Sequence, residues 1–139
     1  MVTDISTSHA QHEVEVILLK QLASYLAVPI FVVDPTGDLV YYNEPAESLL
    51  GRRYDETGEM PMAEWSTIFI PTDDEGNPVP PDALPLSVAL LRQEPDHQSF
   101  WIRGLDNQAR RISVSAFPVI GQHDRHLGAV AMFWEQPRR

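Results

Sequence analysis

Apolar residues between Gln11 and Ala27 recur at the spacing of an α-helix that is hydrophobic on more than one side. At about 100° per residue they cover roughly 260° of the helix circumference, whereas a surface helix needs an apolar face of only about 100°. We therefore expect a helix over residues 11–27 that ends before Pro29, after a flexible lead-in at residues 1–10. The apolar positions are Val14, Val16, Ile17, Leu18, Leu19, Leu22, Ala23, Tyr25 and Leu26.

The next apolar runs are short and rich in β-branched residues, which predicts a hairpin. Ile30–Val33 is apolar throughout, which is typical of a strand buried on both faces, and Leu39–Tyr42 is the returning strand. The intervening Asp34-Pro35-Thr36-Gly37 has turn chemistry, because proline fixes a turn corner and glycine accepts positive φ. Asn43 is a good N-cap for a short helix that Gly51 ends.

The middle of the chain has a weaker pattern. Residues 52–63 are polar without a clear period, and a short helix is expected over Ala63–Phe69. The stretch Pro71–Pro81 holds four prolines and is expected to be a long loop. Asp82 is expected to cap a longer helix that runs from about Ala83 to Gln93.

The last third predicts three consecutive antiparallel strands. They are expected at Gln98–Arg103, Arg110–Ile120 and Gly128–Trp134. In the long middle strand Ile112, Val114 and Ala116 alternate with Ser113 and Ser115, which indicates one buried and one polar face. The last strand is apolar on both faces, so its outer face needs a cover, and the N-terminal helix is the expected cover.

Composition narrows the class of protein. The length of 139 residues and the 43% hydrophobic content indicate one globular domain, and no apolar stretch approaches the roughly 20 residues of a membrane span. The chain has 20 acidic and 10 basic residues, so its net charge of −10 argues against nucleic-acid and anionic-membrane partners. Without a visible secretory signal or any cysteine, a soluble cytoplasmic protein is expected.

Several segments together resemble a PAS domain, in particular a subtype common in bacterial signal-transduction proteins. The first half reads Asp34-x-x-Gly37 and then Asn43-x-x-Ala46-x-x-Leu49-Leu50-Gly51. The second half contributes Gly76-Asn77-Pro78, Leu84-Pro85-Leu86, Leu90, Glu94, Arg110-Arg111, Val114-Ser115-Ala116-x-Pro118 and Gly128-Ala129-Val130. The resemblance covers about residues 20–135.

The resemblance implies an α+β fold. A PAS domain at residues 28–135 would have a five-stranded antiparallel sheet with helices on one face, the N-terminal helix would cover the other, and residues 136–139 would form a tail. PAS domains joined to an effector usually continue into an Asp-[Ile/Val]-Thr motif, whereas this chain reads Phe133-Trp-Glu-Gln-Pro-Arg-Arg139. A stand-alone protein and a piece of a larger one both stay open.

The function implied is a sensory or regulatory module that is not an enzyme. Such a module binds a small molecule or a partner, shifts its N-terminal helix and passes a signal to a downstream effector protein. The alternative is a ligand-free dimerisation and protein-interaction module. Because the N-terminal helix is apolar on too many sides for one sheet, we expect a homodimer built on Val14, Ile17, Leu18, Leu22 and Tyr25.

Ligands of PAS domains bind between the helices and the sheet. The alternation of the strands and the spacing of the long helix place a set of apolar side chains there, so any cavity should suit a hydrophobic or aromatic small molecule. Each member of the set has an ordinary role in core packing as well. The expected lining is Trp65, Phe69, Leu86, Leu90, Phe100, Ile102, Ile112, Val114 and Ala116.

No cofactor, metal or catalytic site is expected. The absence of cysteine excludes covalent flavin photochemistry, and the helix expected at Leu84–Gln93 lacks the histidine on which some PAS sensors carry haem. His97 follows that helix and is interpreted as a surface residue, so haem stays open but disfavoured. Non-covalent flavin is also open but disfavoured, because the sequence gives no positive sign of it.

The remaining polar clusters have ordinary interpretations. The histidines of His123-Asp-Arg-His126, together with His9 and His12, are weak metal candidates, and Asp73-Asp74-Glu75 lacks calcium-loop spacing. Arg103, Arg110 and Arg111 would suit an anionic ligand, although exposed strand ends commonly carry such charges. No nucleophile and base occur in a recognised catalytic motif.

Overall fold

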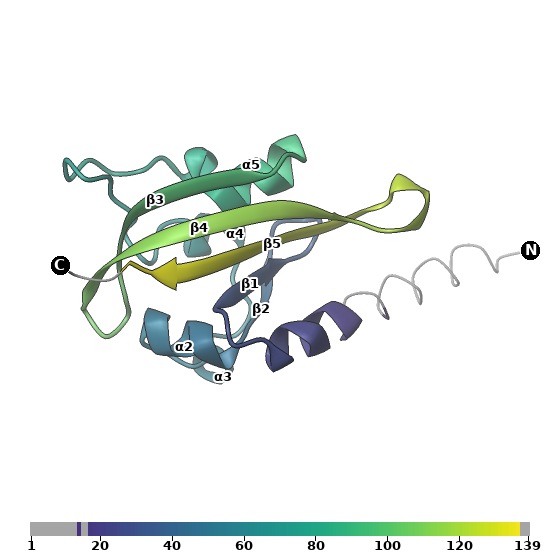
Figure 1. The fold of residues 1–139 in the computed structure, drawn as a ribbon, viewed down its shortest axis with the longest axis horizontal. Helices are drawn as coiled ribbons and strands as arrows, with labels where there is room; N and C mark the ends of the chain where they lie inside the picture. Colours follow the sequence, from purple (N-terminus) through teal and green to yellow (C-terminus); the bar gives the residue numbers. More distant parts are fainter. Residues whose placement is uncertain (1–13, 15–16, 137–139) are drawn as a thin grey trace, which may run out of the picture.

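The computed structural model describes residue 14 and residues 17–136 of the chain. Its centre is a five-stranded antiparallel sheet with the strand order β2-β1-β5-β4-β3 (Figure 1). The first and the last strand of the sequence therefore lie side by side in the middle of the sheet. The strands are β1 Ile30–Val33, β2 Leu39–Tyr42, β3 Asp96–Arg103, β4 Ala109–Ile120 and β5 His126–Glu135.

Short helices pack on one face of this sheet, which we call the inner face. Their apolar residues and the inner-facing side chains of the strands form one large core. The elements between β2 and β3 are α2 Glu44–Leu50, α3 Tyr54–Thr57, α4 Met62–Trp65, the 3₁₀ turn η1 Pro81–Ala83 and α5 Pro85–Arg92, and a second 3₁₀ turn, η2 Gln122–Asp124, joins β4 to β5.

The outer face carries a second, smaller core under the N-terminal helix. Residues 17–25 are helical, and Ala23 of this helix is buried against the sheet together with Val32 of β1 and Val130 of β5. The helix covers only part of this face, since Trp134 near the end of β5 stays 42% exposed. The α+β arrangement expected from the sequence, with helices on both faces of a five-stranded sheet, is confirmed.

Local chemistry explains the hairpin as predicted. The Oδ1 atom of Asp34 accepts hydrogen bonds from the backbone N–H groups of Thr36 and Asp38, and Gly37 takes a φ of 97°. Asn43 caps α2 by accepting a hydrogen bond from the N–H of Ala46, as expected from its position.

The N-terminal helix ends two residues earlier than predicted. It stops at Tyr25, and the N–H of Leu26 then donates to the carbonyl oxygen of Ala23, three residues earlier, at 3.2 Å. The side-chain amide of Asn43 donates to the carbonyl oxygens of Ala23 (2.9 Å) and Val28 (2.8 Å). The predicted lead-in at residues 1–10, most of the first turn of the helix and the end of the tail lie outside the described residues.

The prediction that Asp82 caps the long helix is wrong. Asp82 lies in the 3₁₀ turn η1, and α5 begins only at Pro85. Leu84 occupies the N-cap position in an extended conformation, because a residue that precedes proline is disfavoured in the helical region.

Two other helices also differ from expectation. The helix predicted over Ala63–Phe69 is the shorter α4, Met62–Trp65, and α3 was not predicted because four residues are too few to show a period. The three predicted C-terminal strands are present, and each is longer by one or two residues at an end: β3 begins at Asp96, β4 at Ala109, and β5 spans His126–Glu135.

Candidate functional site

A small cavity lies between the inner face of the sheet and the helices. Its volume is about 70 Å³, and it receives side chains from β1, α2, α4, α5, β3, β4, β5 and the loops next to α4 and α5. Every lining residue is apolar, which is the character of sites for small hydrophobic molecules. The wall consists of Phe31, Leu50, Trp65, Phe69, Pro71, Leu84, Pro85, Leu86, Phe100, Ile102, Ile112, Val114, Ala131 and Phe133.

Most residues expected at this site from the sequence lie in the wall. Leu90 and Ala116 are the exceptions: both are buried in the same core but do not line the cavity. The structure places the others in the wall, namely Trp65, Phe69, Leu86, Phe100, Ile102, Ile112 and Val114.

Sequence reasoning missed two aromatic residues of the wall, Phe31 and Phe133. Phe31 of β1 lies with its ring centroid 5.4 Å from that of Phe133 on β5 and 6.2 Å from that of Phe69. Both β1 and β5 are apolar on two faces, so alternation did not show which side chains point inward. The pairing of Phe31 with Ala131 across the two strands fixes that choice.

The cavity has no polar anchor. The one polar group among its side chains, the indole N–H of Trp65, donates to the carbonyl oxygen of Gly37 at 2.8 Å. The wall therefore offers neither an axial ligand for haem iron nor hydrogen-bonding side chains for a flavin ring. These residues fit neither cofactor.

Arg110 fastens one end of the cavity wall. Its guanidinium donates to the carbonyl oxygen of Leu49 (2.9 Å), next to the wall residue Leu50, and pairs with Asp106 (3.1 Å) and Glu135 (3.3 Å). Helix α2, the β3–β4 turn and the end of β5 are thus joined through one half-buried side chain. The positive charge of Arg110, which could have suited an anionic ligand, is balanced by carboxylates of the chain itself.

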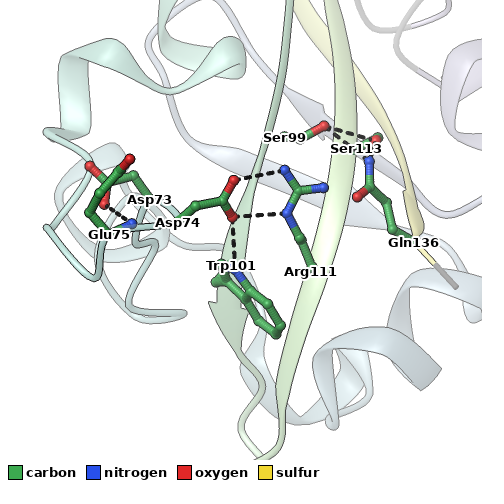
Figure 2. Close-up of polar contacts among 8 residues, drawn as sticks. All are labelled: Asp73, Asp74, Glu75, Ser99, Trp101, Arg111, Ser113 and Gln136. Carbon is green, nitrogen blue, oxygen red and sulfur yellow. Dashed lines mark hydrogen bonds and ion pairs between the residues drawn. The ribbon is translucent and has the colours of Figure 1, made fainter. Parts of the chain in front are cut away.

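Arg111 points to the opposite face and fastens the loop between α4 and η1 (Figure 2). Its Nε and Nη2 atoms donate to the two carboxylate oxygens of Asp74 at 2.9 and 3.0 Å, and the indole N–H of Trp101 donates to the same carboxylate at 3.0 Å. Figure 2 also shows Gln136 reaching the hydroxyl of Ser113 on the neighbouring strand. Arg103 likewise donates to the Asn107 carbonyl oxygen.

The carboxyl group of Asp74 is expected to titrate below its ordinary range. The hydrogen bonds from Arg111 and, to a smaller extent, from Trp101 lower its pKa. The contact therefore stabilises the fold above the ordinary carboxyl pKa and loses this effect as the pH falls through the lowered value. An NMR titration should show the Asp74 midpoint moving upward in the Arg111→Gln variant.

Asp106 supplies an internal control for that titration. Its pKa is also lowered, chiefly by Arg110, which the Arg111→Gln substitution leaves in place. The Asp106 midpoint should therefore stay where it is in the variant. Equal shifts of both carboxyl groups would show a general change in the protein, and the assigned Asp74 contact would be refuted.

The apolar residues of the N-terminal helix form a second notable surface. Ala23 is buried and Leu19 half-buried against the sheet, whereas the residues on the other sides of the helix face solvent. Exposed fractions run from 53% to 79% for the five residues of the expected dimer interface, which we call the helix patch: Val14, Ile17, Leu18, Leu22 and Tyr25.

The weak metal candidates gain no geometric support. Within the described residues, no three side chains of histidine, aspartate or glutamate gather in a way that would hold a metal ion. The carboxylate of Asp73 accepts from the backbone N–H groups of Glu75 and Asn77, which is the chemistry of a turn. His9 and His12 lie outside the described residues, and none of the described helices is long and apolar enough to cross a membrane.

Known structures share this fold. A PAS domain from Colwellia psychrerythraea is 19% identical with a TM-score of 0.61, covering 88% of this chain and 99% of its own. The PAS domain of nitrogen regulation protein NR(II) from Vibrio parahaemolyticus is 15% identical with a TM-score of 0.58, covering 86% and 98%. The LOV domain of a blue-light activated histidine kinase from Erythrobacter litoralis is 14% identical with a TM-score of 0.62, covering 81% and 99%.

At such identities these similarities establish the fold alone. A comparison with curated protein sequences finds no match. The family profile of the PAS fold, in contrast, matches residues 17–134, which is most of the chain. PAS domains are commonly sensory or signalling modules and typically non-catalytic. The sheet order, the helices on its inner face and this match agree, and the chain belongs to the PAS family.

Proposed function

We propose that this chain is a sensory PAS domain whose inner cavity binds a small apolar molecule. The observation that supports this function is the wall of the cavity, which is apolar throughout and includes five aromatic side chains. An apolar wall excludes charged and strongly hydrated ligands, because their polar groups would lose hydrogen bonds to water without replacement. The ligand class is a compact hydrocarbon-like or aromatic molecule.

The size of the cavity supplies the mechanism. Its volume of about 70 Å³ is half of the roughly 150 Å³ at which an engineered apolar cavity accepts benzene. A ligand as large as a benzene ring therefore has to displace part of the wall. The wall includes Leu50 of α2 and Phe31 of β1. Asn43 connects β1 to the N-terminal helix, because its backbone N–H donates to the carbonyl oxygen of Ile30 and its side-chain amide donates to the carbonyl oxygen of Ala23. Displacement of these elements would reach the N-terminal helix and so report occupancy.

Benzene should raise the melting temperature of the protein. At a concentration ten times its dissociation constant, the stabilisation would be about 1.4 kcal/mol, or a few degrees. The Ala131→Val variant adds two methyl groups at the wall and should lose most of this shift. Ala116→Val is the matched control, since Ala116 is equally buried but lies outside the wall, and that variant should keep the shift. Equal shifts in both variants would show that benzene binds elsewhere.

The small cavity also favours a second candidate, a ligand-free interaction module with a nearly filled core. The two functions differ in what accompanies the purified chain. Native mass spectrometry should detect a mass increment of a bound small molecule if the chain is a ligand sensor. The bare chain mass, together with no benzene stabilisation, would favour the ligand-free module.

In either case we propose that the chain forms a homodimer through the helix patch. An exposed apolar patch of several large side chains usually marks an interface, and twofold dimers are the commonest assembly. Burial of each leucine or isoleucine side chain is worth roughly 1.5–3 kcal/mol, so a few per protomer suffice for a dimer at micromolar concentration. A downstream effector protein would then respond to a change in the packing of the two helices.

Leu22→Lys should shift the chain towards monomer. The substitution places a charge on the helix patch and should weaken dimerisation by about tenfold or more, because two copies of the site are lost per dimer. Leu91→Lys is the matched control: Leu91 on α5 is 60% exposed, close to the 58% of Leu22, but lies away from the patch. Sedimentation of the wild type and of both variants measures the fraction of dimer, which should fall only in Leu22→Lys. A wild type that stays monomeric at high micromolar concentration would contradict the dimer.

A further inference from the structure

Strand β3 forms one edge of the sheet (Figure 1). Part of that edge is closed by the chain itself. The backbone N–H and carbonyl groups of Trp101 pair with Thr72 at 2.8 and 2.9 Å, and the N–H of Arg103 donates to the carbonyl oxygen of Phe69 at 2.7 Å. The segment from Phe69 to Thr72 thus acts as a short sixth strand along the second half of β3.

The first half of the same edge is open. Residues 96–103 pair with β4 in unbroken register, so the backbone groups of every second residue point away from β4. Trp101 and Arg103 belong to this outward set, and so do His97 and Ser99. The outward backbone groups of His97 and Ser99 make no hydrogen bond within the described part of the chain. Both residues are exposed.

A groove lies beside this open edge on the inner side of the sheet. Its volume is about 360 Å³, and it is bordered by η1, α5 and the start of β3. The ionisable side chains around it are Asp82, Glu94 and Asp96 against Arg92 alone. The amide of Gln98 fixes its floor by donating to the carbonyl oxygen of Ala83 and to the carboxylate of Asp96.

We infer that this edge and groove bind an extended, positively charged segment of a partner protein as an added strand. Backbone pairing with His97 and Ser99 would supply affinity, and lysine or arginine side chains at alternate positions would enter the acidic groove. An open edge is a template for pairing, and β3 lacks the lysine or bulge that commonly protects such an edge. The site is separate from the inner cavity, so its test is independent of the proposed function.

The probe is the peptide acetyl-Thr-Lys-Thr-Lys-Thr-Lys-Thr-amide, added to the intact ¹⁵N-labelled chain at low salt. The largest amide shifts should fall on residues 96–99, and hydrogen exchange of the His97 and Ser99 amides should slow. Two N-methylated peptides test strand pairing, one methylated at the lysines and one at the threonines. Only one of these sets has N–H groups that point towards β3, so one peptide should bind about tenfold more weakly than the other.

Charge variants test the groove. The double variant Asp82→Asn with Glu94→Gln should weaken binding of the unmethylated peptide by about tenfold. The control is the double variant Glu59→Gln with Glu75→Gln, which removes the same charge from exposed loops and should change the affinity less than about twofold. The inference is overturned if the peptide fails to bind, if both methylated peptides bind equally, or if both double variants weaken binding equally. Protection of the His97 and Ser99 amides that rises with protein concentration alone would also overturn it, because a second copy would then occupy the edge.

Discussion

Replacement of Gly128 by alanine is expected to destabilise the fold by about 4 kcal/mol, near the upper end of single substitutions. Gly128 lies at the start of β5 with a φ of 120°, where an L-residue is strained. A methyl group at this position would overlap the carbonyl oxygen of Val33 on the neighbouring strand. Because the obstacle is backbone in the centre of the sheet, β1 or β5 has to move. Urea unfolding followed by tryptophan fluorescence measures the loss.

Gly76→Ala separates the two causes. Gly76 also has a positive φ, 85°, but a methyl group there would meet no atom within 4 Å. This variant should lose only the roughly 1 kcal/mol that a left-handed conformation costs an alanine. If both variants lose the same free energy of unfolding, backbone conformation alone explains the effect and the close approach of Gly128 to Val33 has no energetic weight.

Asn43→Ala is expected to lower the free energy of unfolding by about 3 kcal/mol, because it leaves several buried backbone groups without partners. The side-chain oxygen of Asn43 accepts from the N–H groups of Ile30 (3.0 Å) and Ala46 (3.3 Å), while the amide donates to the carbonyl oxygens of Ala23 and Val28. One fully buried side chain therefore connects the N-terminal helix, β1 and α2. Urea unfolding measures the loss in the free energy of unfolding. Amide hydrogen exchange of residues 17–25 should accelerate more than that of β4.

Asn43→Asp tests the donor half of this contact. The carboxylate keeps the acceptor oxygen but faces the Ala23 and Val28 carbonyl oxygens, so burial and repulsion should raise its pKa above the ordinary carboxyl value. Its folded-state pKa then exceeds the unfolded one, and the variant should lose stability relative to the wild type as the pH rises between these two values. A stability difference that is independent of pH would show that the amide donors contribute little.

Features set by neighbouring residues were predictable. The Asp34–Gly37 turn and the Asn43 cap depend on chemistry within four residues, and both are as expected. The alternation of Ile112 and Val114 also placed the inner face of β4, because a strand with one polar face reveals its orientation. The cavity wall could be anticipated as far as it consists of such strands.

Contacts between distant segments were not predictable. Arg110 bonds to Leu49, 61 residues earlier in the chain, and Arg111 bonds to Asp74, 37 residues earlier. No local pattern carries this information, so both arginines seemed free to hold an anionic ligand. The predicted start of α5 is wrong for a different reason. Leu84 precedes a proline and is therefore disfavoured in the helical region, and this restriction outweighs the capping preference of Asp82.

The placement of β1 next to β5 has a consequence for how the protein forms during translation. Ile30 pairs with Met132 and Val33 with Ala129, so the centre of the sheet joins residues about a hundred positions apart. Such non-local pairing makes folding slow, since the closure entropy of the intervening chain is lost before the contacts form. The β1–β2 hairpin leaves the ribosome long before its partner and has an unpaired apolar edge in the interval. Nascent chains that stop before β5 should therefore depend on chaperones and remain sensitive to protease until residues 126–135 emerge.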